Sequence, residues 1–107
     1  MDPILTSSVK IARKDLTPRL NGKKQKDWIL ACETLGIWVP EGSGKGSHRC
    51  GYTEINCDRA DNRTLVVTIQ QHMYPVAQVQ KIKQLIAYGI KSGKYNEDDV
   101  WRAFGII

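Results

Sequence analysis

The sequence predicts one α+β domain in which two helices pack on a three-stranded antiparallel sheet, followed by a short extra helix. Three observations lead to this prediction. Apolar residues recur with helical spacing near residues 24–35 and 75–92. Between these stretches lie three short segments rich in β-branched and aromatic residues, and their connections are too short for parallel crossovers. The length of 107 residues provides one compact core and a tail.

The first helix is predicted to begin at about Lys24. Trp28, Cys32 and Leu35 stand at positions i, i+4 and i+7, which places their side chains on one apolar face. Gly36 follows at a position where helices commonly end. We therefore expect a helix of about three turns with one buried side.

Three strands are expected next. The first is the short apolar run 37–39, and the second extends from about Ser47 to Asn56. The third runs from Thr64 to Gln70 and contains four consecutive residues of high β-propensity, Val66-Val67-Thr68-Ile69. A glycine-rich segment at 40–46 and a polar turn at 57–63 join them, which favours an antiparallel meander.

A second long helix is predicted from Pro75 or Val76, since proline is tolerated in a first helical turn. Gly89 and Gly93 are expected to end it. Its two sides are read from the spacing of apolar and polar residues. The apolar side comprises Val76, Val79, Ile82, Leu85, Ile86 and Ile90, and the polar side comprises Gln78, Gln80, Lys81, Lys83 and Gln84.

The extra helix is expected at 96–105, with Asn96 as its N-cap and acidic residues at 97–99 complementing the helix dipole. Its apolar side should dock on the domain, and its aromatic residues are assigned to the core together with two earlier tryptophans. These core aromatics are Trp28, Trp38, Trp101 and Phe104.

The charge divides the chain into a basic N-terminal arm, residues 1–22, and a domain, residues 23–107, with its core at 24–90. Residues 1–26 carry seven basic and two acidic residues, whereas the remainder carries nine of each, so the whole net charge of +5 lies near the N-terminus. Such an arm suits a polyanion such as RNA, because lysine and arginine displace condensed counterions. The alternative is a solubilising tail.

The cysteines and the hydropathy indicate a cytoplasmic protein. Three cysteines, Cys32, Cys50 and Cys57, are an odd number without Cys-x-x-Cys spacing, which favours reduced thiols over disulfides or zinc. A contribution of His48, Cys50 and Cys57 to a metal site is the open alternative, but we expect no metal and no cofactor. No apolar run approaches the ~20 residues that cross a bilayer, and no signal-peptide stretch opens the chain, so no membrane association is expected.

The segment from Glu41 to His48 carries the strongest chemical signal. It does not match the phosphate-binding loop of nucleotide-binding proteins, because Lys45 precedes a glycine and the next element is a strand instead of a helix. The segment therefore delivers a lysine, a serine and a histidine to the start of the second strand.

Lys45-Gly46-Ser47-His48 resembles the Lys-Gly-Ser-His motif of the HicA family of bacterial toxins. The runs 65–72 and 79–90 are similar to that family's last strand with its histidine and to its closing helix, so the resemblance covers roughly residues 24–90. It implies an α-β-β-β-α sandwich like the double-stranded-RNA-binding domain (dsRBD-like fold). It also implies endoribonuclease activity on messenger RNA (mRNA interferase) and a HicB-like antitoxin as protein partner.

Ribonuclease chemistry without a metal needs a base for the ribose 2′-hydroxyl, an acid for the leaving oxygen and cations for the phosphate. Histidine suits the first role, because its unperturbed pKa of ~6.5 leaves the neutral form abundant in cells. We predict His48 as the catalytic base. Five residues are predicted to assist or to bind RNA: Lys45 and Arg49 at the phosphate, Ser47 at the imidazole or an oxygen, His72 as acid or RNA contact, and Tyr52 as a base-stacking ring on the face of His48.

Two other functions are compatible with these residues. A non-catalytic RNA-binding module of the same fold would bind RNA in a salt-dependent manner without cleaving it. A pure interaction protein would dock a partner through an exposed strand edge or the final helix. RNA cleavage in the presence of EDTA, lost on His48→Ala substitution, distinguishes the nuclease from both.

Overall fold

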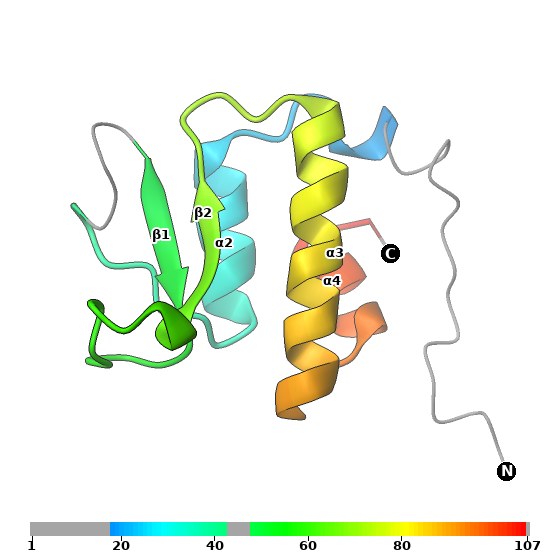
Figure 1. Cartoon of the computed structure of the whole chain (residues 1–107). Helices are drawn as coiled ribbons and strands as arrows, with labels where there is room; N and C mark the ends of the chain where they lie inside the picture. The colour runs from blue at the N-terminus through cyan, green and yellow to red at the C-terminus, as the bar shows by residue number, and fades with distance from the viewer. Residues whose placement is uncertain (1–17, 43–47, 107) are drawn as a thin grey trace, which may run out of the picture.

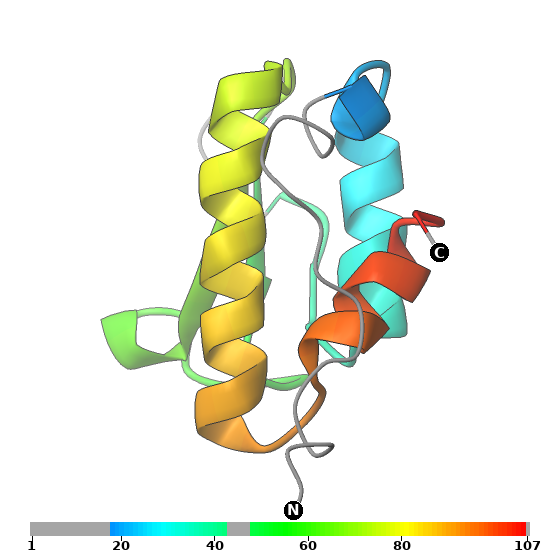
Figure 2. The same ribbon diagram turned by 90° about the vertical axis from the view of Figure 1, so that its right-hand side faces the viewer.

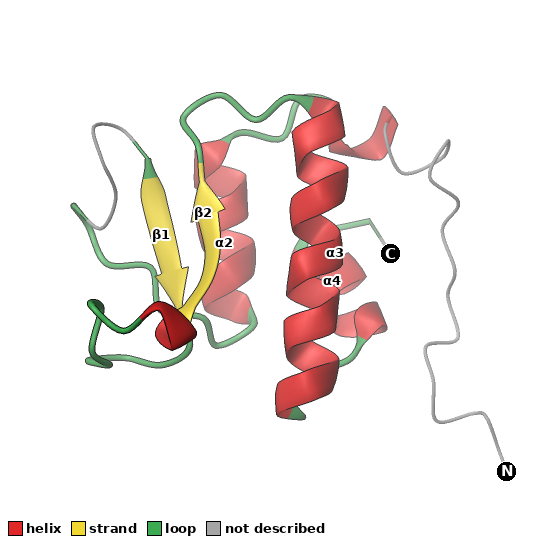
Figure 3. Ribbon diagram, viewed as in Figure 1, coloured by secondary structure: helices red, strands yellow, loops and turns green. Residues whose placement is uncertain are grey.

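The computed structural model describes residues 18–42 and 48–106. It confirms a mixed helix and strand protein, and β1 and β2 form a two-stranded antiparallel sheet (Figures 1 and 3). A helical turn at 18–20 precedes the named elements. In chain order these are α2 (Gln25–Thr34), β1 (Arg49–Tyr52), the 3₁₀ helix η2 (Asn62–Thr64), β2 (Leu65–Ile69), α3 (Pro75–Ser92) and α4 (Glu97–Ala103).

The helices enclose one hydrophobic core against one face of the sheet. Figures 1 and 2 show α2 behind the strands and α3 standing beside β2, and α4 packs against both of these helices. The core cluster extends from Leu20 to Ile106. It therefore includes a residue that precedes the predicted start of the domain at residue 23, while the division into arm and domain stays a prediction.

The prediction of three strands is confirmed only in part. The segment expected as the first strand makes a single antiparallel bridge, between Trp38 and Tyr52. In an antiparallel ladder every second residue bonds to the same neighbouring strand, so the next residues to face β1 would be Gly36 and Pro40. The Gly36 N–H donates to the Glu33 carbonyl at 3.0 Å, and Pro40 has no N–H to offer. Only Trp38 is left to exchange both of its backbone groups with β1, so no full ladder forms at this edge.

β1 is also shorter than the predicted strand at 47–56. Asn56 has a φ of 62°, a left-handed conformation that a strand does not contain, so the chain has turned away by this point. The ladder pairs Gly51 with Val67 but Tyr52 with Leu65, which marks a bulge.

The long helix lies where the sequence predicted it. Pro75 occupies its first turn, and Gly93 ends it with a φ of 77°. Gly89 is an interior residue, which corrects the expectation that it helps to end the helix. A Cβ atom there would lie 2.2 Å from a ring carbon of Tyr95, so glycine is required for the chain to fold back closely.

α4 is confirmed with the predicted cap. The Asn96 side chain accepts a hydrogen bond from the Asp99 N–H, and the Asp99 carboxylate accepts one from the Asn96 N–H, each at 3.0 Å. Trp101 and Phe104 enter the core, where Phe104 meets the Trp28 ring edge-on at 4.6 Å between centroids. This packing attaches the extra helix to α2.

Gln78 corrects the predicted orientation of α3, because this side chain is fully buried. The Trp28 Nε1–H donates to Gln78 Oε1 at 2.7 Å, and Gln78 Nε2 donates to the carbonyls of Leu20 and Met73 at 3.0 and 2.9 Å. Val76 and Ile90, expected on the apolar side, are 63% and 65% exposed. Relative to the orientation predicted from hydropathy, α3 is therefore rotated about its axis. The hydrogen bonds of Gln78, and not hydropathy alone, determine which side of the helix is buried.

We expect Gln78→Met to lower the free energy of unfolding by about 2–4 kcal/mol, because it fills a similar space but leaves three buried polar groups without their partner. Urea unfolding followed by circular dichroism measures the change. Gln80→Met, an exposed control on the same helix, should change the free energy by less than about 0.5 kcal/mol. Equal stability of the two variants would contradict the role assigned to Gln78.

Candidate functional site

The two faces of the sheet differ in what covers them. Val67 and Ile69 point into the core, and Gly51 lies opposite Val67. On the other side Cys50 Sγ lies 3.9 Å from Thr68 Oγ1, and Figure 1 shows no described α-helix in front of this side, only the short η2 at the lower end of the strands. We call this side the outer sheet face and define it by Trp38, His48, Cys50, Tyr52 and Thr68.

His48 lies at one end of the outer sheet face and is exposed. It immediately precedes β1, and the pairing of Arg49 with Ile69 brings it to the point where Gln70 leaves β2. Alternation along an extended chain gives it the side of Cys50. The imidazole therefore meets the first condition for a base that acts on a large substrate, which is access from solvent.

Arg49 holds the chain next to the predicted glycine loop. Its guanidinium donates from Nε to the Pro40 carbonyl at 3.2 Å and from Nη2 to the Val39 carbonyl at 2.9 Å. A guanidinium has five N–H groups, so a phosphate contact would have to use the others. These hydrogen bonds make Arg49 a positioning residue for the segment that leads into the loop. Lys45 and Ser47, the other predicted contacts in that loop, lie outside the described residues.

Tyr52 does not fit the base-stacking role predicted for it. Its side chain is only 6% exposed, and its ring contacts the Trp38 ring at 5.9 Å between centroids. Burial, followed by the neighbouring Cys50 thiol and its hydrogen bond, raises the pKa of the Tyr52 phenol. Tyr52 and His48 are an even number of residues apart, which assigns them to the same face of the sheet. On that face, however, Trp38 covers the Tyr52 ring.

Trp38 is the aromatic side chain that reaches the surface on this face. It was assigned to the core from its apolar neighbours, yet it is only partly buried. The Arg59 guanidinium lies over its ring, 5.9 Å from the centroid, within the range of a cation–π contact. The sequence did contain a signal for this exposure. Trp38 lies between Ile37 and Val39, which both enter the core, and alternate residues of an extended segment point to opposite sides.

Lys81 adds a cation beside the outer sheet face. This α3 residue is partly buried, and burial lowers the pKa of its ammonium group, while the nearby Cys50 thiol acts in the opposite direction. The sequence placed Lys81 on the polar side of the helix but gave no indication that it approaches β1. The sheet therefore has positive charge within reach of its surface.

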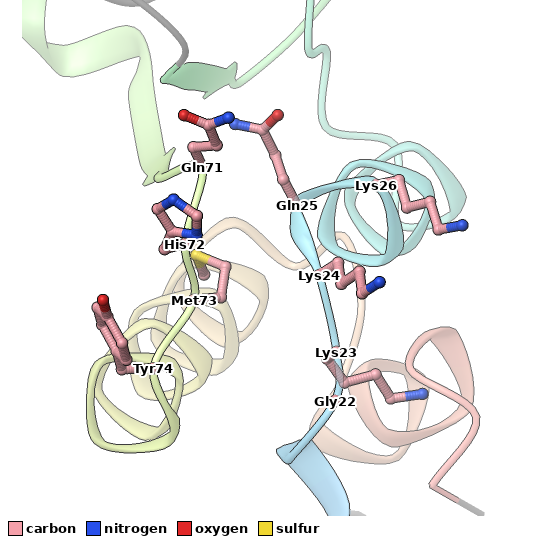
Figure 4. Close-up of a pocket in the computed structure, with 9 residues that line it drawn as sticks. All are labelled: Gly22, Lys23, Lys24, Gln25, Lys26, Gln71, His72, Met73 and Tyr74. Carbon is pink, nitrogen blue, oxygen red and sulfur yellow. The ribbon is translucent and has the colours of Figure 1, made fainter.

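His72 is exposed on the loop after β2, at the same end of the sheet as His48. It lines an open pocket of about 540 Å³ between residues 22–26 and 71–74. In Figure 4 the ammonium groups of Lys23, Lys24 and Lys26 point away from His72. The start of α2 is attached to this end of the sheet by a hydrogen bond from Gln25 Nε2 to the Ile69 carbonyl at 3.3 Å.

Within residues 18–42 and 48–106, no three His, Cys, Asp or Glu side chains gather closely enough to hold a metal ion. In the same part of the chain, no helix combines the length and apolar character needed to span a membrane. No protein-family model, curated protein or solved structure matches the chain.

The three thiols should differ in reactivity. Burial raises the pKa of Cys32 to about 12, whereas Cys50 and Cys57 are only partly buried. Since the thiolate is the reactive form, we expect iodoacetamide at pH 8 to modify Cys50 and Cys57 well before Cys32. Peptide mass spectrometry measures the order, and labelling of all three in urea is the control. Cys50 reacting as slowly as Cys32 would contradict the exposure assigned to the outer sheet face.

Proposed function

We propose that this protein is a metal-independent endoribonuclease, the mRNA-cleaving toxin of a toxin–antitoxin pair, as its resemblance to the HicA family implies. The observation that carries the proposal is the exposed His48 at the end of a sheet face that no described α-helix covers. The same resemblance implies a dsRBD-like sandwich, and we propose this fold as well. If the bridge at Trp38 is counted as a third strand, the order of the elements agrees with it.

The proposed reaction needs only proton transfer and displacement at phosphorus. Neutral His48 takes the proton of a ribose 2′-hydroxyl, and the 2′-oxygen attacks the adjacent phosphorus. The bond from phosphorus to the 5′-oxygen breaks, and that oxygen receives a proton from an acid. The products are a 2′,3′-cyclic phosphate and a 5′-hydroxyl. DNA is not a substrate in this mechanism, since it lacks the attacking group.

The remaining roles follow from position. His72 is the candidate acid, because it lies on the loop that leaves β2 at the end where His48 enters β1. Lys81 supplies positive charge beside the face, and Arg49 positions the segment that continues to Lys45 and Ser47. In this proposal RNA lies along the outer sheet face, and the basic residues at 1–26 increase its local concentration.

The protein partner in this proposal is a HicB-like antitoxin that acts in the cytoplasm by covering His48. An inhibitor seated there would also cover the neighbouring part of the outer sheet face. Antitoxin and RNA would then compete for one surface of the toxin, and no separate regulatory site is required.

The test is incubation of messenger RNA with the wild-type protein, His48→Ala and Lys91→Ala, each with and without EDTA. Lys91 is exposed near the far end of α3 and serves as a matched control. We expect the wild type and Lys91→Ala to cleave under both conditions. His48→Ala should be slower by about 100-fold or more, the usual contribution of a general base. Circular dichroism confirms that each variant is folded.

The outcomes separate the candidate functions. Cleavage retained by folded His48→Ala would overturn the assignment of the base, and cleavage abolished by EDTA would overturn the metal-independent mechanism. RNA that stays intact while binding the wild type in a salt-dependent manner would replace the nuclease by the non-catalytic RNA-binding module.

A further inference from the structure

We infer that Trp38 and Arg59 form a stacking site for an unpaired nucleobase of single-stranded RNA on the outer sheet face. The inference rests on the proposed RNA-directed function and adds a contact that the motif at 45–48 does not contain. Its starting point is an aromatic ring that is partly exposed and lies beneath an arginine side chain.

Tyr52 of β1 holds the Trp38 ring in place. The Trp38 backbone exchanges two hydrogen bonds with Tyr52, at 3.0 Å and 2.7 Å, and the buried Tyr52 ring supports the indole at 5.9 Å between centroids. A ring fixed in this way loses little conformational entropy when a ligand stacks on it. The site therefore has the rigidity that a base platform requires.

Arg59 gives the site its chemical preference. Its guanidinium lies 5.9 Å from the centroid of the indole, so a second cation would be repelled, whereas a flat neutral ring would be accepted on either partner. Unpaired bases bind in this way, stacked on aromatic rings and on guanidinium planes. The neighbouring Arg63 differs, because it makes a salt bridge of 2.8 Å to Asp61.

The position relative to His48 identifies which base would bind. Trp38 pairs with Tyr52, four residues along the chain from His48, and at ~3.3 Å per residue the two positions are about 13 Å apart. A base on Trp38 therefore belongs to a nucleotide that flanks the one whose 2′-hydroxyl reaches His48. Cys50 and Tyr52 line the interval on the same face.

The test measures binding of a fluorescein-labelled decamer of uridylate and of a decamer of abasic ribose phosphate with the same charge. His48→Ala serves as the background, so that the RNA stays intact. Removing one stacked base costs ~1–3 kcal/mol, so we expect Trp38→Leu to weaken uridylate binding by about 5- to 150-fold and to leave abasic binding unchanged. Arg59→Gln should weaken uridylate binding, whereas Arg63→Gln should not.

Tryptophan fluorescence provides a second readout. Trp28 and Trp101 are buried, so quenching of the emission by uridylate should come from Trp38 and disappear in Trp38→Phe. Tight uridylate binding without quenching, or an equal loss for both decamers in Trp38→Leu, would overturn the stacking site and leave RNA binding standing. No binding of either decamer by any variant would overturn the proposed function itself.

Discussion

A buried amide has both a donor and an acceptor to satisfy, and Gln78 does so with three separate parts of the chain: Trp28 of α2, Leu20 in the turn before it, and Met73 in the loop after β2. These contacts fix the rotation of α3 and the course of the loop at 70–74. Because that loop carries His72 and borders His48, the geometry of the candidate site depends on an interaction in the core that contains no functional residue.

The short strand β1 contributes to the core through Gly51 and to the outer sheet face through Tyr52. At Gly51 a Cβ atom would lie 2.8 Å from Ile37 Cγ2, so the absence of a side chain lets the segment 37–39 approach β1. That approach brings Trp38 against Tyr52 on the opposite side of the sheet. The core packing of Gly51 and the surface position of Trp38 are therefore two consequences of the same close contact.

The sequence was informative where structure is decided locally and less so where distant groups compete. Helix limits followed from spacing and caps, as for Pro75 and Asn96. The first strand was overestimated because the Gly36 N–H, which would face β1 next after Trp38, bonds instead to Glu33 at the end of α2, a competition that no local pattern reveals. Gln78 was misplaced because polarity does not indicate whether a buried partner exists. For the candidate site, the exposure of His48 next to β1 agrees with the expectation while its role stays a prediction, whereas the covering of Tyr52 by Trp38 required the fold.

The two ends of the described chain are joined by a hydrogen bond from Arg19 Nη1 to the Ile106 carbonyl at 2.8 Å. Both ends lie on the far side of α3 from the two strands (Figure 1). The described chain therefore begins and ends on the opposite side of α3 from the strands that carry Trp38 and His48. A neighbouring domain, a fusion partner or an immobilising tag can be accommodated there without obstructing the surface at which a long polymer would have to lie.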